Sequence, residues 1–556
     1  MKISLERGKG ILRRRDLPNR EKSVPFVWKA PTHLGNDGKV CFVLPHGTLF
    51  NHNDTAIRFQ QSLLRAHAVT RVVNLTDYRF FLFEESLAPA LVIRYRKERP
   101  KDSSQLIEYW APKTDWAVRQ AEILRVLPQD RSRFTIREVL DDLRSDDAPR
   151  IWKERFWATP RDRRLLDRLS IMPRLRDRVS QSRRGAAKRW LIAEGFQPLG
   201  KNDDPAEAQI LTLPSRLFVK ATAKELNLFL LEDDCRELPS QEVAVRARSN
   251  KNIQVFKAPH VLVTKGFRAA FADFDVSFRH ALRGIHGPKS DRDLLIFLAA
   301  YLRSDLARFF LFHTSSNWGV YRPEVHVEEL LRLPFPQPEE THDSKRCHAI
   351  VRETAAIVTG ASNEASRDFV DREGVVRRAR ESLGRLIEEY FDIDDIERML
   401  IADTVQVVIP SVQPRGERSV PTIVQSDDSL RVSYTRLLCE RLNGWAKQEY
   451  RVHGRNLADP SIGVGMVVLE KTGREEKPAQ SSNSDREFLK AIDHLQQTAA
   501  KSYATSEMVQ GLTVFHKNLL YITKPLGQRF WTDTAALNDA DEIAATILTR
   551  SAREWE

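Results

Sequence analysis

The 556-residue sequence contains only four cysteines, and they lie far apart, at Cys41, Cys235, Cys347 and Cys439. No CxxC pair and no Cys/His cluster is present, so the spacing argues against a zinc site or a disulfide framework. Such sparse usage is typical of a reducing compartment, and we expect a cytoplasmic location. Cys41 falls in an apolar run, where we expect it to be a small buried hydrophobe.

Long apolar runs are also missing. No stretch approaches the ~18–20 residues that a membrane-spanning helix needs, and the N-terminus lacks the apolar core of a signal peptide. The sequence has no GxxxxGKS/T loop, no HExxH motif and no recognisable Ser/His/Asp set. These absences argue against a P-loop nucleotidase, a zinc protease and a triad hydrolase.

Positive charge is in excess. The chain has 88 lysines and arginines against 76 acidic residues, a net charge of +12. This balance favours a polyanionic partner, most plausibly nucleic acid, although charge alone does not separate DNA from RNA or an anionic surface.

The excess is concentrated between Arg161 and Arg189, where only Asp162, Asp167 and Asp177 are acidic. Its cations are Arg161, Arg163, Arg164, Arg168, Arg174, Arg176, Arg178, Arg183, Arg184, Lys188 and Arg189. One interpretation is a helical surface that binds phosphates through arginine forks. The other is a solvated helix face with internal ion pairs, and we favour the first because the excess is so one-sided.

The stretch from Gly38 to Glu98 alternates apolar runs with one amphipathic segment. Val40–Leu44 predicts a buried strand, Asn53–Ala66 a helix, and Arg71–Leu75 and Ala90–Arg96 two further strands. This order predicts the last part of a doubly wound sheet closed by an antiparallel edge strand. The earlier strands would hold a cofactor, and they need far more than the residues before Val40. We therefore expect the cofactor-binding half to be missing from this chain.

Several motifs in this stretch carry a family resemblance: Phe26–His33, Val40–Pro45, Arg58, Asn74–Leu75 with Phe81 and Phe83, and Pro89–Tyr95. They resemble the C-terminal part of the catalytic domain of N6-adenine DNA methyltransferases of the restriction-modification and phage-defence kind. Leu294–Pro336 resembles the end of such an enzyme's target-recognition region. The resemblance implies S-adenosylmethionine as cofactor and double-stranded DNA as partner.

The catalytic motifs of that family are not found. The sequence has no Pro-Pro-Tyr or Pro-Pro-Phe, and only Asp459–Gly465 resembles a DPxxGxG loop. We interpret Asp459–Gly465 as a turn before a strand, because Met466–Leu469 is apolar and β-branched rather than the start of a helix. We therefore assign no catalytic, cofactor-binding or metal residue, and expect a protein partner to bind S-adenosylmethionine.

Other candidate DNA contacts lie outside the basic span, at Lys257, Lys265, Asn317, Trp318, Tyr321 and Arg322. The loop HTSSNWGVYR (residues 313–322) could offer donors to base edges. Alternatively, its aromatic residues anchor the loop to the core. Lys265 and Gly266 favour the end of a strand and a turn.

The composition predicts an α/β and α+β multidomain chain. Residues 1–100 are expected to form a partial Rossmann-like methyltransferase sheet, 101–200 a helical basic region and 201–340 a mixed α/β target-recognition region. A helical segment (341–404), a linker (405–428) and a small α+β domain (429–556) follow. Thr135 is a predicted N-cap, and residues 293–313 suit one helix.

Three functions follow from this organisation. In the first, the chain is the DNA-binding portion of a methyltransferase that needs a partner chain. In the second, it is a non-catalytic DNA-binding or specificity subunit of a defence complex. In the third, it is a truncated product with an open sheet edge.

Overall fold

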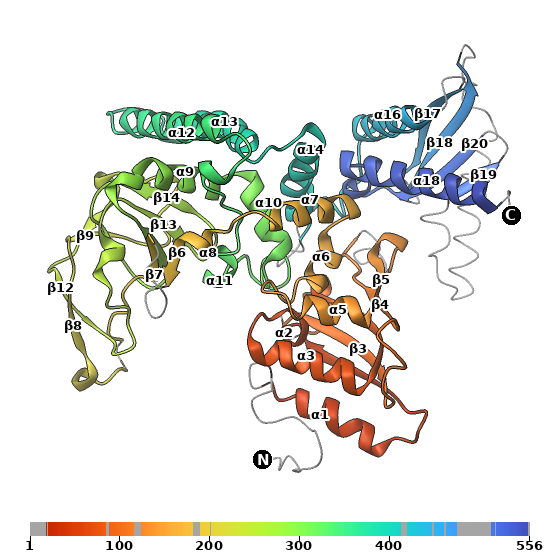
Figure 1. Cartoon of the computed structure of the whole chain (residues 1–556), viewed down its shortest axis with the longest axis horizontal. Helices are drawn as coiled ribbons and strands as arrows, with labels where there is room; N and C mark the ends of the chain where they lie inside the picture. Colours follow the sequence, from red (N-terminus) through yellow and green to blue (C-terminus); the bar gives the residue numbers. More distant parts are fainter. Residues whose placement is uncertain are drawn as a thin grey trace. The chain divides into compact units, whose positions relative to one another are not determined.

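The computed structural model describes residues 18, 21–84, 88–115, 124–181, 189–200, 202–412, 420–446, 450–460, 463–474, 513–516 and 519–553. The chain divides into two compact units: Met1–Arg163 with Ala402–Glu556, and Arg164–Ile401 (Figure 1). Both units mix helices with sheets, in agreement with the predicted multidomain α/β class. No helix within the described ranges is long and apolar enough to cross a membrane. The predicted domain boundaries stay predictions.

A five-stranded sheet forms the N-terminal part of the first unit. Its order is β1 (Lys39–Pro45), β3 (Ala90–Arg96), β2 (Ala68–Asn74), β4 (Leu106–Trp110) and β5 (Arg131–Thr135). β2 and β4 are parallel, whereas β3 is antiparallel to both of its neighbours. The predicted strands are confirmed, but the antiparallel strand expected at the edge lies inside the sheet. Its Leu91, Ile93 and Tyr95 are at most 1% exposed, which suits an interior strand.

One face of this sheet is covered by helices α1 (Val24–Lys29) and α3 (Asp54–Ala66). Trp28 packs between Phe59 of α3 and His67, and His67 packs on Tyr95. Asn53 caps α3 through its side chain, as the predicted helix requires. The expectation of a buried Cys41 is wrong: its side chain is on the opposite, exposed face, because strand residues alternate between faces.

The predicted helical span over residues 101–200 contains both helices and strands. Its helices are α5 (Ile136–Asp142), α6 (Ile151–Trp157), α7 (Pro160–Ser170) and α8 (Leu175–Arg178). Thr135 caps α5 in a capping box with Glu138, as predicted. The basic span is not one helix: α7 ends at Ser170, three residues before Pro173, which cannot continue a helix. Beyond it, β6 (Val179–Gln181) and β7 (Trp190–Glu194) pair in parallel.

The C-terminal part of the first unit is a four-stranded antiparallel sheet with two helices. The strands are ordered β17 (Tyr450–Asp459), β18 (Val464–Gly473), β20 (Leu519–Pro525) and β19 (Thr513–His516). The helices are α16 (Asp428–Trp445) and α18 (Asp533–Arg553). Asp459 and Val464 pair across a hairpin, so the DPxxGxG-like string precedes a strand and opens no helix.

The second unit is built on a six-stranded sheet. Its order is β10 (Leu228–Phe229), β14 (Ala269–Ala272), β13 (His260–Thr264), β16 (Leu282–His286), β7 and β6. Two smaller sheets join β11 (Arg236–Glu237), β9 (Leu217–Val219) and β15 (Ser277–Phe278), and β12 (Glu242–Val245) with β8 (Gln209–Thr212). The core beneath them includes Phe196, Phe256 and Phe278, which pack edge to face.

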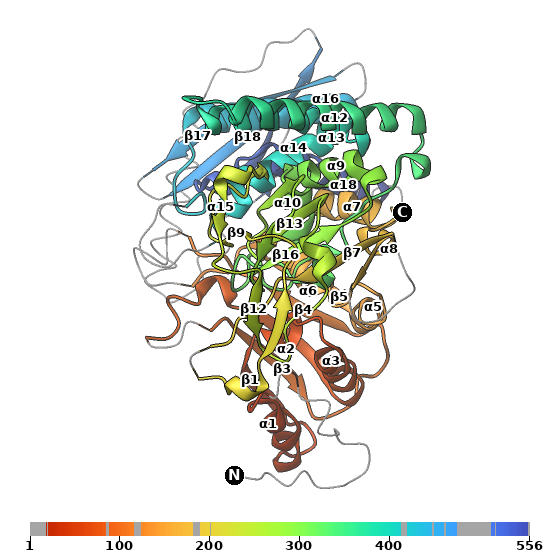
Figure 2. The same cartoon turned by 90° about the vertical axis from the view of Figure 1, so that its left-hand side faces the viewer.

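Helices complete the second unit. They are α9 (Arg292–Leu302), α10 (Asp305–Thr314), α11 (Val327–Leu330), α12 (Ser344–Ala365) and α13 (Arg372–Tyr390), and α14 (Asp395–Asp403) crosses into the first unit. α12 and α13 lie side by side in both views (Figures 1 and 2). The single helix expected over residues 293–313 is two helices, because Ser304 caps a second one. The linker expected from Val405 begins as a helical turn, and α15 (Ile409–Ser411) follows it.

Candidate nucleic-acid interface

Two predicted DNA-binding arginines on α7 are held by acidic partners within their own units. In the first unit, the Arg161 guanidinium donates from Nε and Nη2 to Asp541 of α18, over 3.0 and 2.8 Å. In the second unit, Arg168 Nε donates to Glu397 of α14 over 2.8 Å. Both contacts are bidentate, a geometry that fixes the guanidinium plane. These two side chains therefore hold elements of the fold together.

Arg178 and Arg189 share one buried carboxylate in the second unit. Arg178 Nη2 donates to Asp291 over 3.2 Å, and Arg189 donates to the other oxygen of the same side chain. Trp190 Nε1 completes the set with a 2.8 Å bond to Asp291. The internal ion pairs that the alternative interpretation predicted are present at these positions.

The other described cations of the span lie on several elements. Arg164 is exposed on α7, and Arg176 is half-buried on α8. Arg163 and Arg174 donate to the main-chain carbonyls of Ala158 and Ser170 over 3.4 and 3.2 Å. Arg183, Arg184 and Lys188 lie outside the described residues. A role for these cations in DNA binding stays a prediction.

A buried carboxylate shapes the loop between α10 and α11. Glu329, 2% exposed, accepts the backbone N–H groups of Ser316 and His326, each over 2.8 Å. Asn317 lies at the loop surface, with Nδ2 3.1 Å from His326 Nε2. The loop is thus held at both ends by one side chain, so its shape is fixed before any ligand binds.

The aromatic residues of this loop have different surroundings. Trp318 packs against Phe267 and Phe312, with ring centroids 6.1 and 5.8 Å apart, so it anchors the loop. Tyr321 and Arg322 lie against each other at the surface, with the guanidinium 4.9 Å from the ring centroid. The anchoring interpretation holds for Trp318, and base contacts by Asn317, Tyr321 and Arg322 stay a prediction.

Lys257 and Lys265 are half-buried and use their backbones structurally. The Lys257 carbonyl accepts from His286 Nδ1, and the Lys265 carbonyl from the Val325 N–H, each over 2.9 Å. β13 ends at Thr264, so the predicted turn at Lys265 and Gly266 is confirmed. Contacts of the two ammonium groups with DNA stay a prediction.

A cavity of about 590 Å³ opens beside the loop. Its polar lining includes Gln181, Gln197, Arg248, Asn250, Arg283 and His326. Gln197 Oε1 accepts from Arg248 Nε over 3.1 Å, and Asn250 Nδ2 donates to the Glu194 carbonyl over 2.8 Å. Arg283 is buried, donates to the Val325 carbonyl over 2.7 Å, and has its pKa lowered by burial. No sequence motif indicates this set of residues, because separate strands and turns supply its members.

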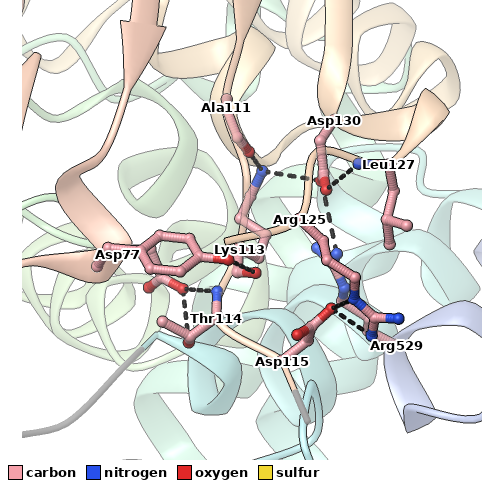
Figure 3. A network of polar contacts seen from close by, with 10 residues as sticks. Asp77, Ala111, Lys113, Thr114, Asp115, Arg125, Leu127, Asp130 and Arg529 are labelled. Atoms are coloured by element: carbon pink, nitrogen blue, oxygen red, sulfur yellow. Dashed lines mark hydrogen bonds and ion pairs between the residues drawn. The ribbon is translucent and has the colours of Figure 1, made fainter. Parts of the chain in front are cut away.

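In the first unit, polar residues cluster where β2 and β4 end. These strands are parallel, so their carboxyl ends meet at one edge, where α/β sheets usually bind ligands. Asp77 accepts from the backbone N–H and hydroxyl of Thr114, over 2.7 and 2.8 Å (Figure 3). Tyr78 donates its hydroxyl to the Lys113 carbonyl over 3.0 Å. This buried polar network thus ties together the segments that follow the two strands.

Lys113 is the cation of this network. Its Nζ donates to the Ala111 carbonyl and lies 3.5 Å from Asp130 Oδ1, and Arg529 also lies 3.5 Å from that oxygen (Figure 3). Burial lowers the pKa of Lys113 to about 8, against the attraction of Asp130. Asp77, Lys113, Thr114, Asp115 and Asp130 are at most 5% exposed. Asp77 bonds to Thr114, Lys113 to Asp130 and Asp115 to Arg125, so these side chains do not fit an open cradle for a nucleoside cofactor.

Comparison with known proteins identifies the N-terminal segment. Residues 11–127 match the family model described as N-6 DNA methylase. This match confirms the resemblance read from the Gly38–Glu98 motifs. No curated protein matches the chain.

Solved structures of restriction-modification proteins are similar at low identity. They include the type IIG restriction endonuclease BpuSI, at 10% identity and a TM-score of 0.26 over 66% of this chain and 49% of that one. The type IIL enzyme MmeI in complex with DNA has 10% identity and a TM-score of 0.32 over 67% and 49%. The HsdS subunit from Thermoanaerobacter tengcongensis has 11% identity and a TM-score of 0.17 over 42% and 52%. The chain spans about half the length of these proteins.

Proposed function

We propose that this chain is the DNA-binding, target-recognition portion of an adenine-N6 DNA methyltransferase in a restriction-modification or phage-defence system. The observation that carries the proposal is the N-6 DNA methylase match over residues 11–127. The net charge of +12 supports a duplex DNA partner, because cationic side chains release counterions when they neutralise phosphates. A cytoplasmic location belongs to the same proposal.

The loop from Ser315 to His326 and its cavity are the proposed recognition surface. Gln181, Gln197 and Asn250 bring amides to the cavity wall, and amides form bidentate pairs with adenine in the major groove. Glu329 holds the loop rigid, which lowers the entropy lost when it binds. Tyr321 and Arg322 extend the surface beyond the cavity.

In this proposal a separate polypeptide binds S-adenosylmethionine and supplies the catalytic loops. Two observations support that division. The sequence contains no Pro-Pro-Tyr or Pro-Pro-Phe loop. The side chains where β2 and β4 end are buried and bonded to one another, so they offer no cradle of their own.

Transfer of tritium from labelled S-adenosylmethionine to duplex DNA tests whether a separate polypeptide supplies cofactor binding and catalysis. We expect none from the chain alone, and transfer to adenine N6 once a polypeptide with DPxxGxG and Asn-Pro-Pro-Tyr loops is added. Transfer by the chain alone would contradict the proposal.

DNA binding is measured separately, by fluorescence anisotropy of a labelled duplex across a salt series. We expect affinity to fall steeply as salt rises. Binding without methyl transfer in any mixture favours the alternative, a non-catalytic specificity subunit. Absence of duplex binding refutes both functions.

A further inference from the structure

The break between α9 and α10 places an arginine at an unusual position. Arg303 ends α9 as its C-cap, and Ser304 begins α10 by accepting the Ala307 N–H over 3.2 Å. Had residues 293–313 formed one helix, Arg303 would have been an ordinary helical residue. The break instead puts it at the junction of two helices, in the wall of a cavity.

That cavity has a volume of about 1220 Å³ and lies within the second unit. Its walls are the turn before β10, the α9–α10 junction and one face of α13. The cationic lining includes Lys224, Arg303, Arg377 and Arg380. Arg380 Nη2 donates to the Arg303 carbonyl over 3.3 Å, so these two residues form one corner of the wall.

Among the described residues, the Arg303 guanidinium forms no ion pair with a carboxylate of this cavity, and its buried Nε has no hydrogen-bond partner. Burial and, to a smaller extent, the neighbouring cations Arg380, Arg308 and Arg268 together lower the pKa of Arg303 to about 10. No carboxylate is among the groups that shift it. A desolvated cation surrounded by cations is costly unless an anion joins it.

Three of the six carboxylates of the cavity wall are engaged in ion pairs with other arginines. Asp305 pairs with Arg308 at 3.4 Å, Glu388 with Arg398 at 2.7 Å, and Glu389 with Arg346 at 2.6 Å. Glu373, Glu381 and Asp392 complete the acidic lining, and none of them contributes to the shift at Arg303. α10 also begins in this wall, and the positive end of its dipole adds to the attraction for an anion.

We propose that Arg303 and Arg380 form an oxyanion site in this cavity, which takes a phosphate or phosphoryl group. A guanidinium fork presents two parallel N–H donors to such a group, so the ligand supplies both the missing charge and the missing acceptor. The site does not depend on the function proposed above, since the anion can come from a DNA backbone or from a free phosphorylated ligand.

Thermal unfolding with inorganic phosphate as the probe tests this site on the full chain. Ionic strength is held constant with chloride. We expect phosphate to raise the wild-type Tm by about 2–4 °C, as binding to the folded state alone requires. Arg303→Met should melt no lower than wild type without phosphate, because it removes an uncompensated charge, and it should show no phosphate response. Arg352→Met, on an exposed position of α12, is the matched control and should respond like wild type.

Arg303→Lys provides a second variant that keeps the charge but loses the fork. We expect about tenfold more phosphate for half of the Tm rise, since a lysine cannot form the bidentate pair. The proposal is overturned if wild type shows no phosphate-dependent rise. An equal rise in Arg303→Met also overturns it.

Binding of duplex DNA, measured in place of phosphate binding, distinguishes the two possible sources of the anion. If a backbone phosphate occupies the site, Arg303→Met reduces the slope of log affinity against log salt by about one. If a free phosphorylated ligand occupies it, that slope is unchanged while the phosphate response is still lost. Both results support the site, and failure to bind DNA at all would count against the proposed function alone.

Discussion

Lys113 and Arg303 are both cations withdrawn from solvent, yet their surroundings differ. Lys113 donates to the Ala111 carbonyl and lies 3.5 Å from the Asp130 carboxylate. Arg303 has a buried Nε without a hydrogen-bond partner among the described residues. The charged groups that shift its pKa are all cations. A cation with its own carboxylate is part of the fold, whereas a cation without one indicates a place for a ligand. Burial alone does not distinguish the two.

The largest expected effect comes from removing the carboxylate at the first site. Asp130→Ala leaves the buried side chains of Lys113 and Arg529 without their shared acid. We expect a loss of about 3–5 kcal/mol in the free energy of unfolding of the first unit. The midpoint of urea unfolding measures it. Asp141→Ala breaks only the exposed pair with Arg144 and should cost less than about 1 kcal/mol. Equal losses would show that the network is not structural.

The second prediction concerns the buried carboxylate of Glu329. Glu329→Gln replaces an acceptor of the Ser316 and His326 N–H groups by an amide that can also donate. We expect a local loss of about 2 kcal/mol, seen as roughly thirtyfold faster hydrogen exchange at these amides. Glu328→Gln, on the exposed neighbour, is the control. Unchanged exchange in Glu329→Gln would mean that the loop does not depend on this carboxylate.

Features set by local sequence patterns could be predicted, whereas features set by tertiary packing could not. Local patterns predicted the strands around Val40, Val72 and Ile93, the Thr135 cap, and the turn before a strand at Asp459–Gly465. The sequence did not indicate that Arg168, Arg178 and Arg189 meet acidic residues far along the chain. Such pairs depend on tertiary packing, which a one-sided run of arginines does not reveal. The position of β3 inside the sheet likewise depends on pairing rather than on its own residues.

The third prediction uses pH to test whether Lys113 titrates as a buried group. Its folded pKa is about 8, below the roughly 10.4 of an unfolded lysine. The unfolded state therefore binds more protons between these values, and stability rises with pH. From pH 8 to 9.5 we expect wild type to gain about 1.5 kcal/mol relative to Lys113→Met, measured by urea unfolding. Lys101→Met, at an exposed position, should follow wild type. Parallel pH profiles for wild type and Lys113→Met would contradict the lowered pKa.

The smallest expected effect is a difference between two arginines of α7 in how their replacement changes DNA binding and stability. Arg168 is paired with Glu397, whereas Arg164 is exposed on α7. If α7 contacts DNA, Arg164→Gln should reduce the slope of log affinity against log salt by about one. Arg168→Gln should leave the slope unchanged and lower stability by about 1 kcal/mol, because it loses an internal partner. Anisotropy of a labelled duplex measures the slope, and thermal unfolding measures the stability. An unchanged slope in Arg164→Gln would remove it from the DNA-binding surface, and a change only in Arg168→Gln would mean that DNA displaces Glu397.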